Sequence, residues 1–191
     1  MKNKPGRLCP VERAGTLDSK LRRWFQDPQK IMKPYLKPGM TALDFGCGPG
    51  FFTLDMAQMV GASGQVIATD LQQGMLEKVH TKIQGTDLEN RIRLHQCEEN
   101  KINLAEPIDF FFSFYVMHEV PDQEVLFREI SRMLKPDGAV FIAEPPVHVS
   151  RKAFEATLDL ARENGLRLAE RPRVFLSKAA VLTKTSEGVR S

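Results

Sequence analysis

Three glycines at alternate positions form the most distinctive chemical pattern in the sequence. Gly46, Gly48 and Gly50 follow an apolar run that ends in an acid, Asp44. Because glycine has no side chain, these positions remove every β-carbon from one side of a loop, so a ligand can lie against bare backbone amides near the start of the next helix. The pattern predicts a binding site for a small ligand.

The residues after the loop exclude two phosphate-binding motifs. A dinucleotide fingerprint has the spacing GxGxxG, but Phe51 occupies the position of its third glycine. A P-loop carries Lys and Ser or Thr after its last glycine, whereas this chain has Phe51 and Phe52. The pattern that remains is acid-x-Gly-x-Gly-x-Gly, from Asp44 to Gly50.

Strand-like and helix-like runs alternate around this loop. Runs of apolar and β-branched residues predict strands at 40–45, 64–70, 91–97, 108–116, 139–144, 166–177 and 179–184. Helical spacing and end signals predict helices at 27–39, 51–61, 72–85, 122–134 and 150–164. Strands that alternate with such helices indicate right-handed βαβ crossovers and a mainly parallel sheet. The last two strands are joined by a short connection around Ser177, which predicts one antiparallel strand.

Capping residues mark several of the expected helix ends. Asp27 precedes Pro28, which suits the first position of a helix. Asp122 and Ser150 stand as N-caps of the two later helices, and Lys135–Gly138 (KPDG) predicts a turn that closes the first of them. These signals place one helix before the fifth strand and one after it.

The order of strand, acid, glycines and helix resembles motif I of the class I S-adenosylmethionine-dependent methyltransferases. The resemblance extends from about Tyr35 to Lys184, and the layout is similar to the ubiquinone/menaquinone-biosynthesis-like group (methyltransferase type 11/25), which methylates small molecules. It implies an α/β fold of the Rossmann-like, doubly wound type, with a mainly parallel seven-stranded sheet, one antiparallel strand and helices on both faces. It also implies S-adenosyl-L-methionine as the cofactor.

The resemblance assigns further residues to this cofactor. In the family, the second strand ends in an acid that accepts hydrogen bonds from both ribose hydroxyls, and Asp70 stands at that end. Leu71 and Met75 match positions that flank the adenine, while Cys97 occupies the position of an acid that binds the adenine amino group, for which Glu98 would substitute. The cofactor-binding residues so implied are Asp44, Gly46, Cys47, Gly48, Gly50, Asp70, Leu71, Met75, Cys97, Glu98 and Phe114.

The segment after the fourth strand carries the candidate catalytic residues, Tyr115 and His118. A methyl group on a sulfonium is already reactive, so an enzyme of this kind mainly aligns the acceptor and excludes water, and it requires no metal and no covalent intermediate. A protonated hydroxyl or amine acceptor needs a base. His118 is the best candidate because imidazole titrates near neutral pH, and Tyr115 would orient the acceptor.

The acceptor is expected to be a small molecule. DNA amino methyltransferases carry an Asn/Asp-Pro-Pro-aromatic segment after the fourth strand, where residues 115–118 read YVMH, and cytosine-ring enzymes use a Pro-Cys pair that this sequence lacks. Trp24 and Phe25 would cover an apolar acceptor, or Trp24 would simply pack on the core. Two other classes stay open: RNA methylation guided by the basic N-terminal residues, and a cofactor-binding partner protein without catalysis.

Length and composition are those of one compact globular domain. The 191 residues are 42% hydrophobic and 27% charged, and a net charge of +3 is too small to indicate nucleic-acid binding by itself. Residues 1–34 are expected to form an N-terminal helical lid or leader, and residues 35–191 the methyltransferase domain. No apolar run reaches the ~20 residues of a membrane span, so a cytoplasmic protein with reduced cysteines (Cys9, Cys47 and Cys97) is expected. The oligomeric state is not indicated.

Overall fold

The protein is built around one seven-stranded sheet. The computed structural model describes residues 20–185, with side chains from Arg23 onward, so Cys9 and the basic residues between Lys2 and Arg13 lie outside the described residues. The strands are β1 (Thr41–Phe45), β2 (Gln65–Asp70), β3 (Ile92–Gln96), β4 (Ile108–Phe114), β5 (Leu134–Glu144), β6 (Leu166–Glu170) and β7 (Lys178–Lys184). Their order is β3-β2-β1-β4-β5-β7-β6; β7 runs antiparallel to both of its neighbours, β5 and β6, and the other neighbouring pairs within residues 20–185 are parallel. The expected sheet is confirmed.

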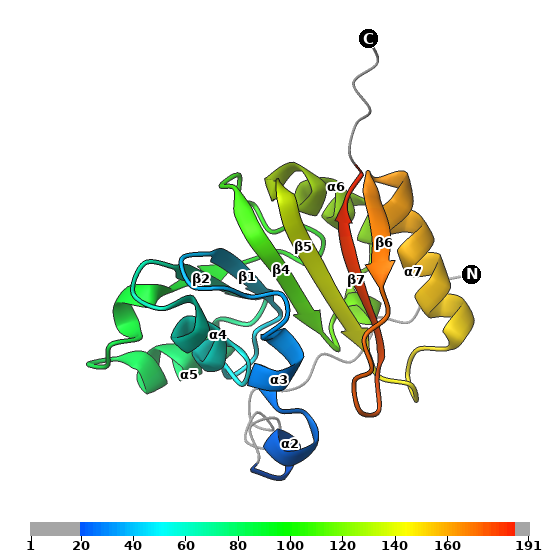
Figure 1. Ribbon diagram of the computed structural model, residues 1–191. Coiled ribbons are helices and arrows are strands. Elements are labelled where there is room, and N and C mark those ends of the chain that lie inside the picture. Colours follow the sequence, from blue (N-terminus) through cyan, green and yellow to red (C-terminus); the bar gives the residue numbers. More distant parts are fainter. Residues whose placement is uncertain (1–19, 186–191) are drawn as a thin grey trace.

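Helices cover both faces of the sheet (Figure 1). They are α2 (Lys20–Phe25), α3 (Pro28–Met32), α4 (Thr53–Val60), α5 (Gln73–Ile83), α6 (Gln123–Met133) and α7 (Arg151–Glu163), with short 3-10 turns at Glu89–Arg91 and Met117–Glu119. Residues of α3, α4 and α5 belong to one buried hydrophobic cluster, and residues of α6 and α7 to a second. The helices are therefore divided between two layers.

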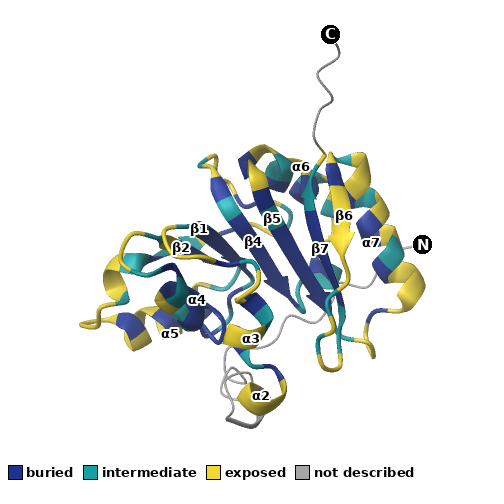
Figure 2. Ribbon diagram, in the orientation of Figure 1, coloured by how far each residue is buried: buried dark blue, intermediate teal, exposed yellow. Residues whose placement is uncertain are grey.

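Alternate residues of β4 show that the two clusters lie on opposite faces of the sheet. Phe110 and Phe112 belong to the cluster that α3, α4 and α5 cover, whereas Phe111 belongs to the cluster that α6 and α7 cover. Successive residues of a strand point to opposite faces. The central strands are accordingly buried along most of their length, while β6 is largely exposed (Figure 2). Burial on both faces explains why β4 is apolar nearly throughout.

The strand order reverses between β1 and β4. From β1 the chain moves outward to β2 and β3, and it then returns to place β4 on the other side of β1. The carboxyl ends of these parallel strands meet at one edge, and such a reversal leaves a crevice in which α/β proteins bind ligands. The glycine loop follows β1, and the segment with Tyr115 and His118 follows β4, so the two meet at this point.

Helix ends follow the capping signals of the sequence. The side chain of Asp27 accepts hydrogen bonds from the backbone N–H groups of Gln29 and Lys30, and it begins α3. Asp122 caps α6 and Ser150 caps α7 in the same way. These expected caps are confirmed.

The expected sixth strand was too long. It was predicted over 166–177, but β6 ends at Glu170. Pro172 has no N–H group for the hydrogen-bond ladder, and Leu176 has a φ of 49°, which a strand does not accommodate. Residues 171–177 are instead the connection to β7.

The expected turn at Lys135–Gly138 was also wrong. β5 begins at Leu134, directly after α6, so no separate turn closes the helix. Ile108 of β4 pairs with Leu134 of β5, yet Phe110, two residues further on, pairs with Ala139. The four KPDG residues of β5 therefore stand opposite the single residue Asp109 of β4, as a bulge inside β5.

Three further features of the described chain bear on function. No helix within residues 20–185 is long and apolar enough to cross a membrane. The same residues hold no group of three or more His, Cys, Asp or Glu side chains arranged to bind a metal ion. Cys47 and Cys97 are free and buried.

Candidate functional site

The three loop glycines differ in what surrounds them. All have positive φ angles, 70° at Gly46, 54° at Gly48 and 88° at Gly50, a backbone conformation that favours glycine. A β-carbon at Gly46 would lie 2.5 Å from Cγ2 of Val116, and one at Gly50 would lie 3.2 Å from Cγ2 of Val79. At Gly48, no heavy atom of the described chain other than those of Gly48 and its two chain neighbours lies within 4 Å of the position that a β-carbon would take. The middle glycine thus borders open space, whereas the outer two pack against the protein.

Asp44 secures the loop at the point where β1 ends. The residue is only 3% exposed, and its Oδ2 accepts a hydrogen bond of 2.6 Å from the hydroxyl of Thr53, the first residue of α4. The bond joins β1 to the start of α4, so the glycine loop between them is held from both sides. The direct contact of Asp44 with a cofactor stays a prediction.

Asp70 connects the loop to the end of β2. Its Oδ2 accepts a hydrogen bond of 2.9 Å from the amide of Gly48, and its Oδ1 accepts one of 2.8 Å from the amide of Gln72. Burial raises the pKa of the Asp70 carboxyl, against the opposing effect of these amide donors. Each carboxylate oxygen has a second lone pair, so the side chain can accept further hydrogen bonds from a diol.

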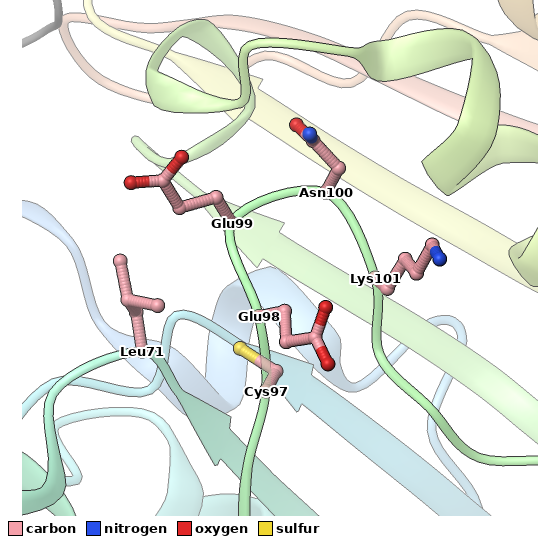
Figure 3. Close-up of a pocket in the computed structure, with 6 residues that line it drawn as sticks. All are labelled: Leu71, Cys97, Glu98, Glu99, Asn100 and Lys101. Atoms are coloured by element: carbon pink, nitrogen blue, oxygen red, sulfur yellow. The ribbon is translucent and has the colours of Figure 1, made fainter.

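A cavity of about 490 Å³ lies at the carboxyl ends of β2 and β3. Leu71 lines it from the turn after β2, and residues 97–101 line it from the segment after β3 (Figure 3). Its volume falls within the range of about 300–1,000 Å³ that is typical of small-ligand pockets. Leu71, Cys97 and Glu98, which the sequence assigned to the adenine, therefore lie around one cavity.

The two residues predicted to receive the adenine amino group differ in chemistry. Burial raises the pKa of the Cys97 thiol to about 12, so this group stays protonated near neutral pH. The Glu98 carboxylate is exposed and accepts a hydrogen bond of 2.8 Å from the amide nitrogen of Asn103. Of the two, only Glu98 presents a charged acceptor at the cavity wall.

Three other residues assigned to the cofactor are buried. Met75 is 2% exposed, and Cys47 and Phe114 are each 7% exposed. The ring of Phe114 packs between those of Phe52, at a centroid distance of 4.6 Å, and Tyr115, at 4.4 Å. Burial raises the pKa of the Cys47 thiol as well. Their contact with a cofactor stays a prediction, and their packing supports the walls of the site.

His118 is held by a buried acid. It lies in the 3-10 turn after β4, and its Nδ1 is 2.5 Å from Oε2 of Glu144, the last residue of β5. The Glu144 side chain is 2% exposed and that of His118 25%, so the imidazole covers the carboxylate. The hydrogen bond to Glu144 raises the pKa of His118, against the opposing effect of burial. Within residues 20–185, Oε1 of Glu144 has no hydrogen-bond partner.

The hydroxyl of Tyr115 joins three segments of the chain. It accepts a hydrogen bond of 2.8 Å from the side-chain nitrogen of Gln26, donates one of 2.9 Å to the carbonyl oxygen of Leu176, and lies 2.8 Å from the hydroxyl of Ser177. Tyr115 thus ties the residue after α2 and the connection between β6 and β7 to the end of β4. Its expected role in orienting an acceptor stays a prediction.

Sequence reasoning missed Glu144 as part of the site, and it missed the contacts that Val116 and Gln26 make there. A signal for Glu144 was present, because an acid at the carboxyl end of a strand beside β4 occupies the same kind of position as Asp70. Nothing in the sequence indicated that Val116 would pack on Gly46, since this contact depends on how β1 and β4 lie together. The same holds for Gln26, whose partner Tyr115 is 89 positions away.

Two curated proteins that this chain resembles in sequence are named as methyltransferases. A demethylmenaquinone methyltransferase of Lactobacillus johnsonii is 38% identical over 110 residues, which make up 57% of this chain and 45% of that protein. A ubiquinone/menaquinone biosynthesis C-methyltransferase of a Shewanella species is 26% identical over 123 residues, 62% of this chain and 49% of that protein. The chain therefore spans about half the length of these curated relatives.

Solved structures share the fold. A SAM-dependent methyltransferase from Aquifex aeolicus has a TM-score of 0.84 and 28% sequence identity, and the match covers 93% of this chain and 100% of that one. A TehB-like SAM-dependent methyltransferase from Corynebacterium glutamicum, with a TM-score of 0.69 and 19% identity over 92% of this chain and 100% of that one, shows the fold alone. S-adenosyl-L-methionine is the cofactor that the family and the fold imply. Residues 36–173 match the family described as "Methyltransferase domain", and the chain therefore belongs to this family.

Proposed function

We propose that this chain transfers a methyl group from S-adenosyl-L-methionine to a small-molecule acceptor. The observation that carries the proposal is the arrangement of Gly48 and Asp70. The amide of Gly48, which borders open space, donates to the carboxylate of Asp70, and the next residue, Leu71, lines the cavity. A backbone cradle at Gly48, a diol acceptor at Asp70 and the cavity beside Leu71 thus follow one another along the site.

The residues present fit the cofactor. The carboxylate of Asp70 suits the two ribose hydroxyls, the free space at Gly48 suits the methionine part, and the cavity beside Leu71 suits the adenine. When bound, the cofactor supplies a methyl group on a positively charged sulfur, which is already activated for transfer. The protein then has to hold the acceptor in line and to exclude water.

His118 is the group that would take a proton from the acceptor. Its Nδ1–H donates to Glu144 in the neutral form, which leaves Nε2 with a lone pair, and within the described range Nε2 has no hydrogen-bond partner. After proton transfer, the carboxylate of Glu144 stabilises the imidazolium. Glu144 acts through His118 and is a positioning residue.

The names of the relatives guide the choice of acceptor. Since they are named for demethylmenaquinone and for ubiquinone/menaquinone biosynthesis, reduced quinones are the first acceptors to test. We further propose that the N-terminal segment acts as a lid. The lid is supported by α2, which is attached to α4 by an ion pair of 2.8 Å between Arg23 and Asp55 and which stacks Phe25 on Phe175 at 4.9 Å.

The first experiment is a calorimetric titration with S-adenosyl-L-methionine and with S-adenosyl-L-homocysteine. We expect binding in the micromolar range, about −8 kcal/mol. Asp70→Ala should abolish most of this binding, whereas Asp159→Ala, which removes an exposed acid on α7, should leave it unchanged. The proposed site would be refuted if the protein bound neither compound, or if the Asp70→Ala variant bound them with the same affinity as the unmodified protein.

Turnover separates an enzyme from a cofactor-binding partner protein. Methylation of a panel of reduced quinones and other phenols would be followed by mass spectrometry. His118→Ala should lower turnover with little effect on cofactor affinity, and His80→Ala, on the exposed side of α5, serves as the control. A loss of cofactor binding with normal turnover would contradict the role of His118.

A further inference from the structure

Exposed apolar side chains gather at one edge of the protein. Among the described residues, six large hydrophobic side chains are exposed, and five of them belong to three segments, α2, the loop after β5 and the connection between β6 and β7. We call these five the apolar rim: Trp24, Phe25, Val147, Phe175 and Leu176. Val147 is 89% exposed and Trp24 is 78% exposed, so the rim is covered by no other part of the described chain. The sixth, Leu168, lies on β6.

Direct contacts bring the three segments of the rim together. The rings of Trp24 and Phe25 are 4.8 Å apart, and Phe25 stacks on Phe175 at 4.9 Å. The ammonium group of Lys178, at the start of β7, donates a hydrogen bond of 2.8 Å to the carbonyl oxygen of Val149 and so joins the loop after β5. Figure 1 shows α2, the end of β5 and the β6–β7 connection at the lower edge of the molecule, where the carboxyl ends of β4 and β5 lie.

The segments that carry the rim are strongly basic. Residues 23–35, 145–152 and 171–178 contain eight Lys and Arg and a single acid, Asp27, whereas the whole chain has 27 basic and 24 acidic residues. Three of the eight are paired with acids, Arg23 with Asp55, Lys30 with Asp27 and Arg171 with Glu155. The other five form no ion pair with the described residues: Lys33, Arg151, Lys152, Arg173 and Lys178. The segments that carry the rim therefore hold five cations that no acid of the described residues neutralises.

We propose that the apolar rim and these cations form a surface that docks on an anionic lipid bilayer. Aromatic and aliphatic side chains on loop tips enter the interfacial zone of a bilayer, where Trp is the favoured aromatic residue, and Lys and Arg bind the phosphates of the head groups. A single-stranded nucleic acid would share the attraction to the cations, but Val147 and Leu176 offer no ring on which a base can stack. The proposal goes beyond methyl transfer, because it concerns a binding surface whose contact with a bilayer does not depend on catalysis.

Trp24 provides a direct probe, because it is the only tryptophan of the chain. The full chain would be mixed with vesicles of phosphatidylcholine alone and with vesicles that also contain phosphatidylglycerol. We expect flotation with the anionic vesicles only, a shift of Trp24 emission to shorter wavelength, and weaker binding in high salt.

Matched variants assign the binding to the rim. Phe175→Ser should weaken flotation and reduce the emission shift. Leu168 is an apolar residue of similar exposure on β6, and Leu168→Ser should do neither. Arg173→Ala should lower the partition coefficient about fivefold, since one basic residue near an anionic surface contributes roughly 1 kcal/mol. Arg132→Ala on α6 is the charge control.

Several outcomes would overturn the proposal. These are no flotation with anionic vesicles, an unchanged Trp24 emission, equal effects of the rim variants and their controls, or a preference for RNA over the vesicles. Calorimetry with S-adenosyl-L-homocysteine on the same samples measures cofactor binding separately, so a failure of the bilayer proposal can be told apart from a failure of the proposed function. Retained cofactor binding without flotation refutes the bilayer surface and leaves methyl transfer in place.

Discussion

Alanine at Gly46 and alanine at Gly48 are expected to damage the protein in different ways. A β-carbon at Gly46 would lie 2.5 and 2.7 Å from the two methyl groups of Val116, and 3.1 Å from its Cβ, whereas carbon atoms in contact are about 3.5–4.0 Å apart. Rotation of the Val116 side chain does not relieve the contact with Cβ. Overpacking of this kind costs about 1–3 kcal/mol, and the positive φ costs a further 1–2 kcal/mol or so.

Gly46→Ala should therefore lower the free energy of unfolding by about 2–5 kcal/mol. Gly48→Ala carries only the backbone cost of roughly 1–2 kcal/mol, because open space surrounds the added methyl group. The same methyl group occupies the room proposed for the cofactor. Gly48→Ala should therefore lose much of its affinity for S-adenosyl-L-homocysteine while it loses little stability. Urea denaturation measures the first effect, and calorimetry measures the second.

A second substitution tests the packing argument itself. Val116→Ala removes both methyl groups that clash, so it should restore part of the stability of Gly46→Ala, while the backbone cost remains. Equal losses of stability for the two glycine variants would refute the assignment of Gly46 to packing. Unchanged cofactor affinity in Gly48→Ala would refute the assignment of Gly48 to binding.

Three further predictions follow from hydrogen bonds of the site and of its helices. The pKa of His118 is raised in the folded protein, so its pair with Glu144 stabilises the fold fully below pH ~6.5, and this stability is lost as the pH rises through the raised pKa. Glu144→Gln should remove this dependence and move the acidic limb of the kcat/KM profile to lower pH. Thr53→Val leaves the buried Asp44 without its hydroxyl donor and should cost about 1–3 kcal/mol in urea denaturation, with helicity retained. Asp122→Ala removes the cap of α6 and should cost ~1 kcal/mol, measured by thermal unfolding; no change would mean that the cap is dispensable.

Local signals predicted the half of the site that follows β1 and β2. The glycine loop and Asp70 could be recognised because each lies at the end of an apolar run, and the loop requires residues that accept a positive φ. Asp27, Asp122 and Ser150 were recognisable as caps for the same reason, since each bonds to backbone groups two or three positions away. Interactions between residues a few positions apart can be predicted from the local sequence alone.

The other half depends on how distant strands lie together. The His118–Glu144 pair joins residues from β5 and from the turn after β4, and it exists only because these strands are neighbours in the sheet. The contacts of Tyr115 with Gln26 and with Leu176 span still longer separations along the chain. The spacing of apolar residues shows which face of an element is buried, but not which element covers that face. Contacts between such distant residues could therefore not be predicted from the sequence pattern.

The place of β7 in the sheet has a consequence for the order in which the chain folds. β6 pairs only with β7, although it is made first, so it cannot join the sheet until β7 has paired with β5. The contacts that bind Tyr115 to residues 176 and 177 form at this late step, whereas the glycine loop needs only β1, β2 and the segment after β4. Hydrogen exchange during refolding should show protection of β1, β2 and β4 before that of β6. The glycine loop and Asp70 are thus in place before the apolar rim is assembled, and nascent chains that stop short of β7 hold the rim residues without the strand that positions Phe175 and Leu176.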